Sequence, residues 1–203
     1  MSDFYVIVAG MGRCGTSLVF SSIAEKLEDR SFVKHIENYS FENGGVYKTH
    51  DLPPLNLSGN PKVIFMFGNP MNIAVSADNV DKESRRNDNY EWSYAHYNHL
   101  HADVSKKDLF HKEDTLGLEK QFDLWCKPQT FPLLTVRYET MFYNLHTIKE
   151  FLGISDINFP EKIPRKTNWK EHIFKEDLEK TYKALNEKII LAPDIKKWDI
   201  SNE

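Results

Sequence analysis

Three short apolar runs along the chain predict the strands of a central sheet. They lie at residues 4–9, 63–67 and 132–136. The first is rich in β-branched and aromatic residues and is apolar on both faces, which is typical of a strand buried within a parallel sheet. A stretch with helical periodicity follows each run. Strands that alternate with helices in this way predict an α/β fold with a mostly parallel sheet.

Apolar residues at helical spacing mark four predicted helices. The first covers residues 16–27, directly after a glycine-rich turn. The second starts at Pro70, a residue suited to the first helical position, and runs to about residue 78. The third carries apolar residues from 141 to 152 on one face and is closed by Gly153. The fourth runs from about 174 to 190.

Residues 80–112 show no such pattern. The segment is polar and rich in Asn, His and Tyr, and we expect loops and irregular helix there. No internal repeat, low-complexity tract or Ser/Gly-rich linker divides the chain, and 203 residues are an ordinary size for one domain. We therefore predict a single domain over residues 1–203, with a three-layer α/β/α arrangement around the parallel sheet.

Composition and charge narrow the class of protein. With 40% hydrophobic and 28% charged residues, the chain is unlike a disordered or fibrous protein. Its net charge of −4 argues against a general nucleic-acid binder, because such proteins carry a basic surplus. The longest apolar run, residues 4–12, is shorter than the roughly 20 residues of a membrane span and lacks the features of a signal peptide, so no membrane insertion is expected. Two cysteines, Cys14 and Cys126, fit free thiols in a reducing compartment, and we expect a cytoplasmic protein.

The turn at residues 10–17, GMGRCGTS, has the spacing of a phosphate-binding P-loop, but Thr16 stands where the P-loop has lysine. Glycines let backbone N–H groups converge on an anion, and the following helix adds its positive end. None of the predicted strands ends in the aspartate that helps to hold Mg²⁺. The alternative is a glycine-rich turn without a ligand, but Arg13, a cation beside a helix N-terminus, favours a bound anion. We expect the turn to hold a phosphate without hydrolysing ATP or GTP.

Two groups of basic residues outside the turn are candidates for chemistry. Lys48 and His50 lie two positions apart, so on an extended segment their side chains point to the same side. The alternative for His50 is an ordinary surface-loop histidine. The histidines at 96, 99 and 101 are spaced i, i+3 and i+5, which is no established metal-ligand pattern. For His96, His99 and His101 we therefore expect an exposed helix or a substrate-lining loop, and no metal.

Five segments, in order over residues 4–190, resemble the motifs of sulfotransferases that use 3′-phosphoadenosine 5′-phosphosulfate (PAPS). They are the 5′-phosphosulfate loop at 12–17, the Lys-Thr-His-Leu-Pro segment at 47–53, the 3′-phosphate motif at 62–79, the Arg-Tyr-Glu strand end at 136–139 with a Phe-Leu-Gly helix end at 151–153, and the Arg-Lys and Trp-Lys pairs at 165–170. Each motif alone is weak support, but five in the right order are hard to obtain by chance. The resemblance implies a fold of the P-loop nucleoside-triphosphate-hydrolase type.

The resemblance also implies roles for individual residues. His50 matches the general base, Lys48 its companion near the leaving group, and Arg13 the cation at the oxygen that bridges the phosphate and the sulfuryl group. The donor-binding residues implied are Arg13, Cys14, Gly15, Thr16, Ser17 and Leu18 near the 5′-phosphate and adenine, then Ser76, Arg165 and Lys166 at the 3′-phosphate, and then Tyr138 near the adenosine.

Three positions depart from the family's pattern. Gly68 occupies the place of an arginine that binds the 3′-phosphate. The arginines that could compensate are Arg85, Arg86 and Arg165. Leu18 stands where many members have a tryptophan that stacks on adenine, and Thr167 replaces a glycine after Arg-Lys. These changes concern the affinity for the donor more than its identity.

The function predicted from these residues is transfer of a sulfuryl group from PAPS to a hydroxyl of a small molecule or carbohydrate. The reaction would be an in-line displacement with His50 as general base and no metal. PAPS would be the co-substrate and adenosine 3′,5′-bisphosphate (PAP) its product. Two alternatives stay open, a nucleotide-dependent kinase with a degenerate P-loop and a non-catalytic nucleotide-binding module. The acceptor pocket is expected near residues 87–101, but neither the acceptor nor the oligomeric state can be read from the sequence.

Overall fold

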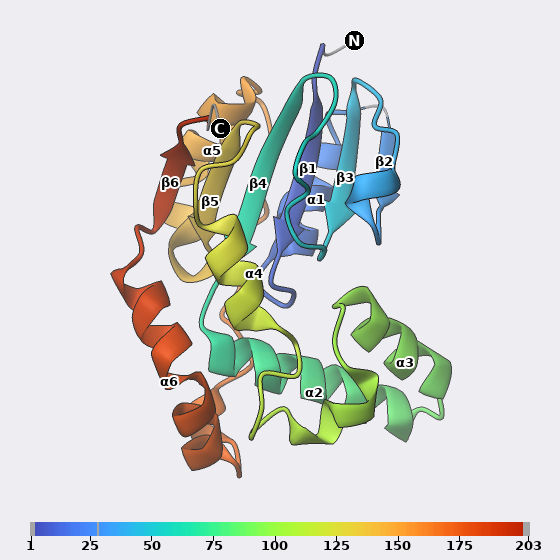
Figure 1. Ribbon diagram of the computed structural model, residues 1–203, viewed down its shortest axis with the longest axis vertical. Helices are drawn as coiled ribbons and strands as arrows, with labels where there is room; N and C mark the ends of the chain where they lie inside the picture. Colours follow the sequence, from blue (N-terminus) through green and yellow to red (C-terminus); the bar gives the residue numbers. More distant parts are fainter. Residues whose placement is uncertain (1–2, 28, 201–203) are drawn as a thin grey trace.

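A six-stranded sheet lies at the centre of the computed structural model, which describes residues 3–27 and 29–200 (Figure 1). The strands follow the order β2-β3-β1-β4-β5-β6. Their bounds are β1 Tyr5–Gly10, β2 Asp29–Phe32, β3 Gly45–Thr49, β4 Pro61–Phe67, β5 Leu133–Arg137 and β6 Ile195–Trp198. All neighbours pair in parallel except β5 and β6, which are antiparallel. The predicted α/β class with a mostly parallel sheet is confirmed.

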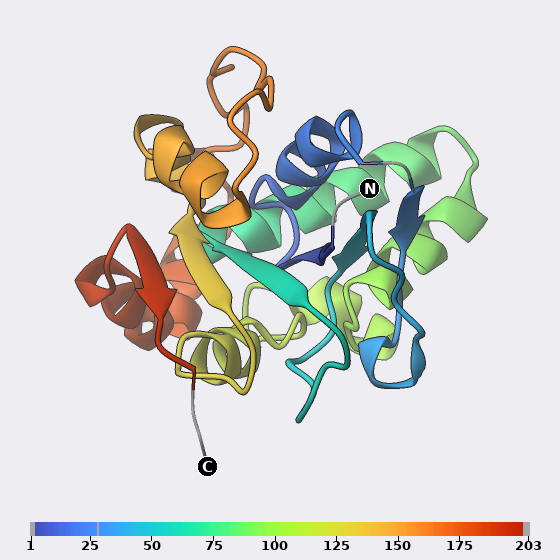
Figure 2. The same cartoon turned by 90° about the horizontal axis from the view of Figure 1, so that it is seen from above.

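Helices on both faces complete the three predicted layers. Their bounds are α1 Thr16–Ala24, α2 Pro70–Arg86, α3 Tyr90–His99, α4 Leu118–Trp125, α5 Leu145–Leu152 and α6 Lys175–Leu191. In Figure 1, α1 and α5 lie behind the sheet and α4 in front, and Figure 2 shows the same separation from above. α2 and α3 lie beneath the carboxyl ends of the strands. No helix in the described part of the chain combines the length and the apolar character needed to cross a membrane.

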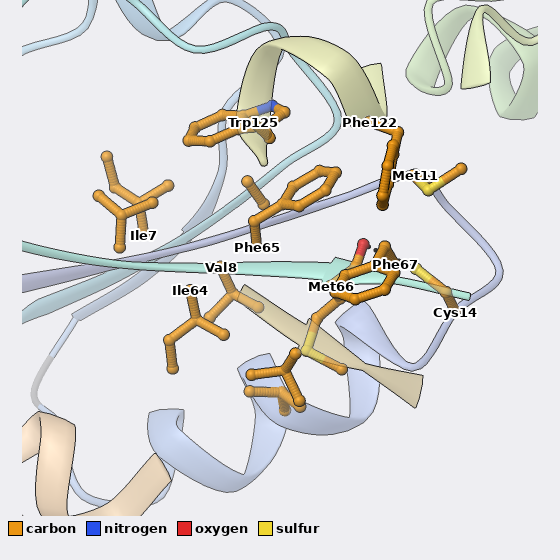
Figure 3. Close-up of a cluster of buried hydrophobic side chains, with 14 of the residues drawn as sticks. Ile7, Val8, Met11, Cys14, Ile64, Phe65, Met66, Phe67, Phe122 and Trp125 are labelled. Atoms are coloured by element: carbon orange, nitrogen blue, oxygen red, sulfur yellow. Dashed lines mark hydrogen bonds between the residues drawn. The ribbon is translucent and has the colours of Figure 1, made fainter. Parts of the chain in front are cut away.

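The two central strands, β1 and β4, are buried on both faces. Phe65 of β4 stacks on Trp125 of α4 with ring centroids 5.3 Å apart, and Phe67 meets Phe122 edge-on at 5.4 Å (Figure 3). Ile64 and Met66, which alternate with these two residues along β4, point to the opposite face, toward α1. Burying one large apolar side chain stabilises the fold by roughly 1.5–3 kcal/mol. Packing on both faces therefore holds β1 and β4 firmly in place beneath the turn that follows β1.

The expectation of loops and irregular helix over residues 80–112 is wrong for much of the segment. α2 continues well past its predicted end, and α3 follows it after a short connection. The inward face of α2 carries polar residues: Asp81 is 2% exposed and pairs with Arg85 one turn later. Asn89 starts α3 by accepting a hydrogen bond from the backbone N–H of Trp92 at 3.1 Å. Because ion pairs and caps replace an apolar stripe here, hydrophobic periodicity does not reveal these helices.

The edge strands β2 and β6 have no counterpart among the predicted elements. Each is four residues long, and β6 is exposed at its two central positions. Such strands are stabilised mainly by backbone pairing with a neighbouring strand. Four residues are too few for a hydrophobic pattern to predict this pairing. The first predicted helix is shorter than expected, since α1 ends at Ala24.

The later predicted helices are confirmed with small changes at their starts. α5 begins at Leu145, after a 3-10 segment at Tyr138–Tyr143. It ends at Leu152 and is capped by Gly153, whose left-handed φ of 71° closes the helix. α6 buries a single stripe against the rest of the fold. Its members are Leu178, Tyr182, Leu185 and Ile189.

Candidate active site

The carboxyl end of β1 is the point where the strand order reverses, with β2 and β3 on one side and β4 and β5 on the other. Such a reversal leaves a crevice beyond the strand ends in which α/β proteins bind ligands. A pocket of about 450 Å³ lies at this point. Its lining residues are Arg13, Gly15, Thr16, Ser17, Leu18, Phe32, Lys48, His50, Trp92, His96, His99, Leu100 and Tyr138.

The turn between β1 and α1 directs the start of a helix at the pocket. Gly15 is the N-cap residue at φ +81°, a left-handed conformation that favours glycine, and it gives α1 no side-chain cap. A Cβ at this position would lie 2.5 Å from Cδ2 of Tyr138, whose ring packs directly against the turn. Because Gly15 supplies no capping side chain, the backbone N–H groups of Thr16 and Ser17 stay available to an anion.

Three cationic side chains gather at this turn. Nε of Arg13 donates to Oγ of Ser76 on α2 at 3.0 Å. Nη2 of Arg165 donates to the backbone carbonyl of Arg13 at 3.1 Å. Nζ of Lys48 donates to Oγ of Ser17 at 2.7 Å. These contacts join the turn to β3, to α2 and to the segment after α5.

The positive charge of this cluster is poorly balanced by acids. Across the described residues no carboxylate forms an ion pair with Arg13 or Lys48, and Glu139 lies 3.7 Å from Nη1 of Arg165. Desolvation and the charge of Arg165 lower the pKa of Arg13. Desolvation and the charge of Arg13 lower the pKa of Lys48 in the same way. A bound anion would relieve this mutual repulsion.

His50 follows β3 directly, with its ring buried beside the turn. Its Nδ1 is 2.7 Å from the backbone carbonyl of Gly10, and since a carbonyl only accepts, the proton is assigned to Nδ1. Nε2 therefore carries the lone pair. Burial lowers the pKa of His50 from 6.5 to about 3, so the ring is neutral at neutral pH. The site thus combines cations that can hold an anion with a neutral imidazole whose Nε2 carries a lone pair.

α3 forms another wall of the pocket. Trp92, His96 and His99 line it at spacings of three and four residues, and His99 packs on Phe32 with ring centroids 4.7 Å apart. His96 is 8% exposed, and burial together with the charge of Arg13 lowers its pKa to about 4. This wall therefore offers aromatic surface and neutral imidazoles. Its residues belong to the segment 87–101, near which the sequence predicts the acceptor pocket.

A second pocket of about 360 Å³ adjoins the first and shares Arg13, Trp92 and His96 with it. Its remaining lining is mostly polar and includes Glu83 and Asn87 near the end of α2. The open space at the turn therefore continues between α2 and α3, where hydrogen-bonding groups line it.

Two of the residues assigned to donor binding neither line the pocket nor form a hydrogen bond with Arg13. Cys14 is fully buried, with Sγ 3.2 Å from the backbone carbonyl of Met66, and burial raises the pKa of its thiol to about 11. Lys166 is exposed and makes no hydrogen bond or ion pair with any other residue that the structure describes. The other residues assigned to the donor line the pocket or, like Ser76 and Arg165, contact Arg13.

The structure gives a physical reason for Gly68. A Cβ on Gly68 would lie 3.0 Å from Oε1 of Glu139, which accepts a hydrogen bond from the N–H of Asn69 at 2.9 Å. Glu139 therefore fills the space in which the family's arginine side chain would begin. Among the arginines that could compensate, Arg165 lies at the cationic cluster, whereas Arg85 is paired with two aspartates elsewhere.

Phe32 and Glu139 belong to the site but are not singled out by the sequence. Phe32 is the last residue of the edge strand β2, which no periodicity predicts. In the sequence Glu139 stands out only as the last residue of the Arg-Tyr-Glu segment. Its contact with position 68 arises because β4 and β5, which are far apart in the sequence, pair in the sheet. A search for acids within motif segments could have flagged Glu139, whereas nothing in the sequence marks Phe32.

Comparisons with known proteins do not identify the function of this chain. A scan against models of protein families finds no match, and a search of curated proteins finds no relative. Among solved structures, the chain is similar to the crystal structure of a sulfotransferase from Alicyclobacillus acidocaldarius. The identity is 17%, the alignment covers 92% of this chain and 96% of that chain, and the TM-score is 0.33. At these values we draw nothing about function from the likeness.

Proposed function

We propose that this chain is a sulfotransferase that moves the sulfuryl group of PAPS to a hydroxyl of a small-molecule or carbohydrate acceptor. The observation that carries the proposal is a poorly balanced cationic cluster beside a buried, neutral histidine at one turn. The motif segments add support, because each of the five contributes a residue at or next to this pocket. These residues are Arg13, Lys48, Ser76, Tyr138 and Arg165.

The residues around the turn fit a donor that carries two phosphate groups. The free N–H groups at the start of α1 suit the 5′-phosphate. Ser76 and Arg165 suit the 3′-phosphate, with Lys166 from the same loop. Both Ser76 and Arg165 form a hydrogen bond with Arg13, which joins this group to the turn. Tyr138, packed on the turn, would meet the adenosine. The buried thiol of Cys14 leaves only the backbone of that residue for the donor.

The proposed chemistry uses three side chains. Nε2 of His50 accepts the proton of the acceptor hydroxyl while that oxygen bonds to sulfur and the bond from sulfur to the bridging oxygen breaks. The electron pair of the broken bond stays on the phosphate oxygen, where Arg13 and Lys48 neutralise the charge that develops. A histidine in this role contributes roughly 10²–10⁴-fold to the rate. The two cations take the part that Mg²⁺ plays for a triphosphate, so we propose no metal for the transfer.

The acceptor would enter beside α3. Trp92 and Phe32 offer flat apolar surface, and His99 packs on Phe32 in the pocket lining. The adjoining polar pocket leaves room for further hydroxyl groups of a larger acceptor. Both features are compatible with a ring-shaped acceptor that bears hydroxyls, whether a small molecule or a sugar.

Thermal denaturation with two nucleotides separates this proposal from a kinase. PAP without Mg²⁺ should raise the melting temperature, because a ligand at 100 times its dissociation constant stabilises the folded state by about 2.7 kcal/mol. Mg·ATP should have much less effect, since Thr16 replaces the lysine that would reach its terminal phosphates. Stabilisation by Mg·ATP alone would contradict the proposal.

Transfer of labelled sulfate from PAPS then separates an enzyme from a binding module. Sugars, phenols and alcohols serve as acceptors, and at least one class should become labelled. Binding of PAP without transfer to any of them would favour a non-catalytic module. The variant His50→Asn places an amide N–H where Nδ1 lies and removes the base. Unchanged turnover in that variant would exclude His50 from its proposed role.

A further inference from the structure

Two histidines and a carboxylate meet at the rim of the pocket, outside its lining. They are His35, just after β2, Asp51, just after β3, and His101, just after α3. One possible ligand atom of each residue lies within 4.8 Å of those of the other two. The three come from segments far apart in the sequence, so the spacing of neighbouring histidines could not reveal them.

Hydrogen bonds to the backbone already hold two of these side chains in position. Nε2 of His101 is 2.9 Å from the carbonyl of Lys34, so that ring nitrogen donates and the other keeps its lone pair. The carboxylate of Asp51 accepts from the backbone N–H of Ile36 at 3.0 Å and of Leu52 at 2.9 Å. Metal-binding histidines and carboxylates in proteins are oriented by outer hydrogen bonds of this kind. The cluster therefore has the supporting contacts of a ligand set as well as its residue types.

The distances leave a gap that an ion would close. Nδ1 of His35 lies 3.9 Å from Oδ2 of Asp51, too far for a hydrogen bond, and the rings of His35 and His101 stand edge to face with centroids 5.3 Å apart. Ligands bound at about 2.0 Å in a tetrahedron are about 3.3 Å from one another. Small rotations of the exposed His35 and His101 side chains toward Asp51 would bring the three groups to that separation.

We propose that His35, Asp51 and His101 bind a divalent transition-metal ion of the zinc type, with water completing the coordination. Two imidazoles and one carboxylate suit zinc and its neighbours, whereas magnesium and calcium prefer oxygen ligands alone. The sequence predicts no metal, and the proposal adds one outside the transfer chemistry. It is independent of the proposed sulfotransferase function.

The ion would act on the pocket by joining three of the segments that surround it. Asp51 follows His50 directly, and His101 follows Leu100, and both of these neighbours line the pocket. Asp51 is itself anchored to the core, because Nε1 of Trp125 donates to its backbone carbonyl at 3.0 Å. A metal at this point would therefore tie the end of α3 to the firmly held end of β3.

Metal binding to the full chain, prepared without a histidine tag and stripped with a chelator, tests the proposal. Co²⁺ is titrated and followed by its visible absorption, and Zn²⁺ is titrated by calorimetry. We expect one equivalent of each metal to bind. His35→Ala and His101→Ala should each weaken binding at least as much as the loss of an outer hydrogen bond does, about 10–100-fold. His146→Ala, which removes an exposed histidine of α5, is the matched control and should bind as the parent does.

The comparison of metal binding between the parent chain and His35→Ala decides the test. His35 is exposed, so its replacement should leave the fold intact. Circular dichroism checks this. Hydrogen exchange in α3 supplies a second measurement: Zn²⁺ should slow exchange there in the parent chain and not in His35→Ala. Absence of saturable binding, or equal binding by the parent and both variants, overturns the site. Binding without slower exchange in α3 overturns its role at the pocket. Stabilisation by PAP is measured separately and does not depend on either result.

Discussion

The ring of His50 is bonded through Nδ1 to the backbone carbonyl of Gly10, 2.7 Å away, at the point where β3 and β1 end side by side. This contact ties a candidate base to the residue that opens the glycine turn. It also sets the tautomer, so that Nε2 is the nitrogen with a lone pair. The relative position of base and anion-binding turn is therefore fixed by two neighbouring strands rather than by a flexible loop.

Replacing His50 should separate chemistry from binding. We expect His50→Asn to lower the turnover number for sulfuryl transfer by roughly 10²–10⁴-fold, because the proton acceptor is lost while the amide still reaches the carbonyl of Gly10. The dissociation constant for PAP should change little. Steady-state kinetics and calorimetry measure the two quantities. A variant that loses affinity for PAP and keeps its turnover number would show that His50 binds the donor instead.

Replacing Arg13 should weaken nucleotide binding. Hydrogen bonds to charged groups contribute roughly 1.5–3 kcal/mol, so Arg13→Ala should raise the dissociation constant for PAP by about 10–100-fold. The loss should shrink as salt concentration rises, because part of it is electrostatic. Calorimetry at two salt concentrations measures both effects. Lys183→Ala, at an exposed position on α6, is the control and should bind PAP normally. Equal affinity in the two variants would contradict an anion site at the turn.

Adding a side chain at position 68 should destabilise the protein through Glu139. The new Cβ of Gly68→Ala would lie 3.0 Å from Oε1 of Glu139, so this carboxylate must shift and weaken the hydrogen bond that it accepts from Asn69, at a cost of about 1 kcal/mol. The cost should fall when Glu139→Ala is present as well, since the colliding atoms are then gone. Urea denaturation of the four proteins in this cycle gives the coupling free energy. Additive effects would mean that Glu139 does not restrict position 68.

The stability of the protein should depend on pH through His96. Its pKa is about 4 in the folded protein and near 6.5 in the unfolded chain, because burial and the charges of Arg13, His99 and Lys48 disfavour the protonated ring. Between these two values the unfolded chain binds a proton that the folded protein does not. Stability is therefore greatest above pH 6.5 and falls as the pH drops toward 4, by at most about 1.4 kcal/mol per pH unit from this residue.

Urea denaturation at about pH 7.5, 5.5 and 4.5 tests this dependence. His96→Phe keeps a buried ring that does not titrate, so the free energy of unfolding should fall less steeply with decreasing pH than in the parent. Loss of the His96 charge also removes a repulsion that lowers the pKa of His50, so the contribution of His50 changes in the same direction. His146→Phe, at an exposed position, should leave the slope unchanged. Parallel curves for His96→Phe and the parent would mean that His96 is protonated as easily in the folded state as in the unfolded chain.

Much of the site was predictable because its chemistry lies in short segments next to strand ends. Arg13 is inside the glycine turn, and Lys48 and His50 are two positions apart at the end of β3. Parallel strands bring such ends together at one edge of a sheet, so segments that follow different strands meet there. The contacts of Ser76 and Arg165 with Arg13 agree with this expectation, although those residues lie far apart in the chain.

The parts that could not be predicted depend on contacts between distant segments. α3 and the end of α2 carry buried polar residues, so their helical structure left no apolar period to detect. Phe32 reaches the pocket only because β2 pairs with β3. The exclusion of a side chain at Gly68 requires Glu139 from the end of another strand to lie against it.

The sequence by itself determined the α/β class, the two buried central strands, the glycine turn and the identity of the charged groups that surround it. Local spacing is sufficient for these features, since apolar periods and turn residues act within a few positions. Only the tertiary structure decided which nitrogen of His50 is bonded to the backbone, which arginine joins Arg13, and that His35, Asp51 and His101 meet. Each of these depends on the pairing of strands and the packing of helices, which place groups side by side without regard to their separation along the chain.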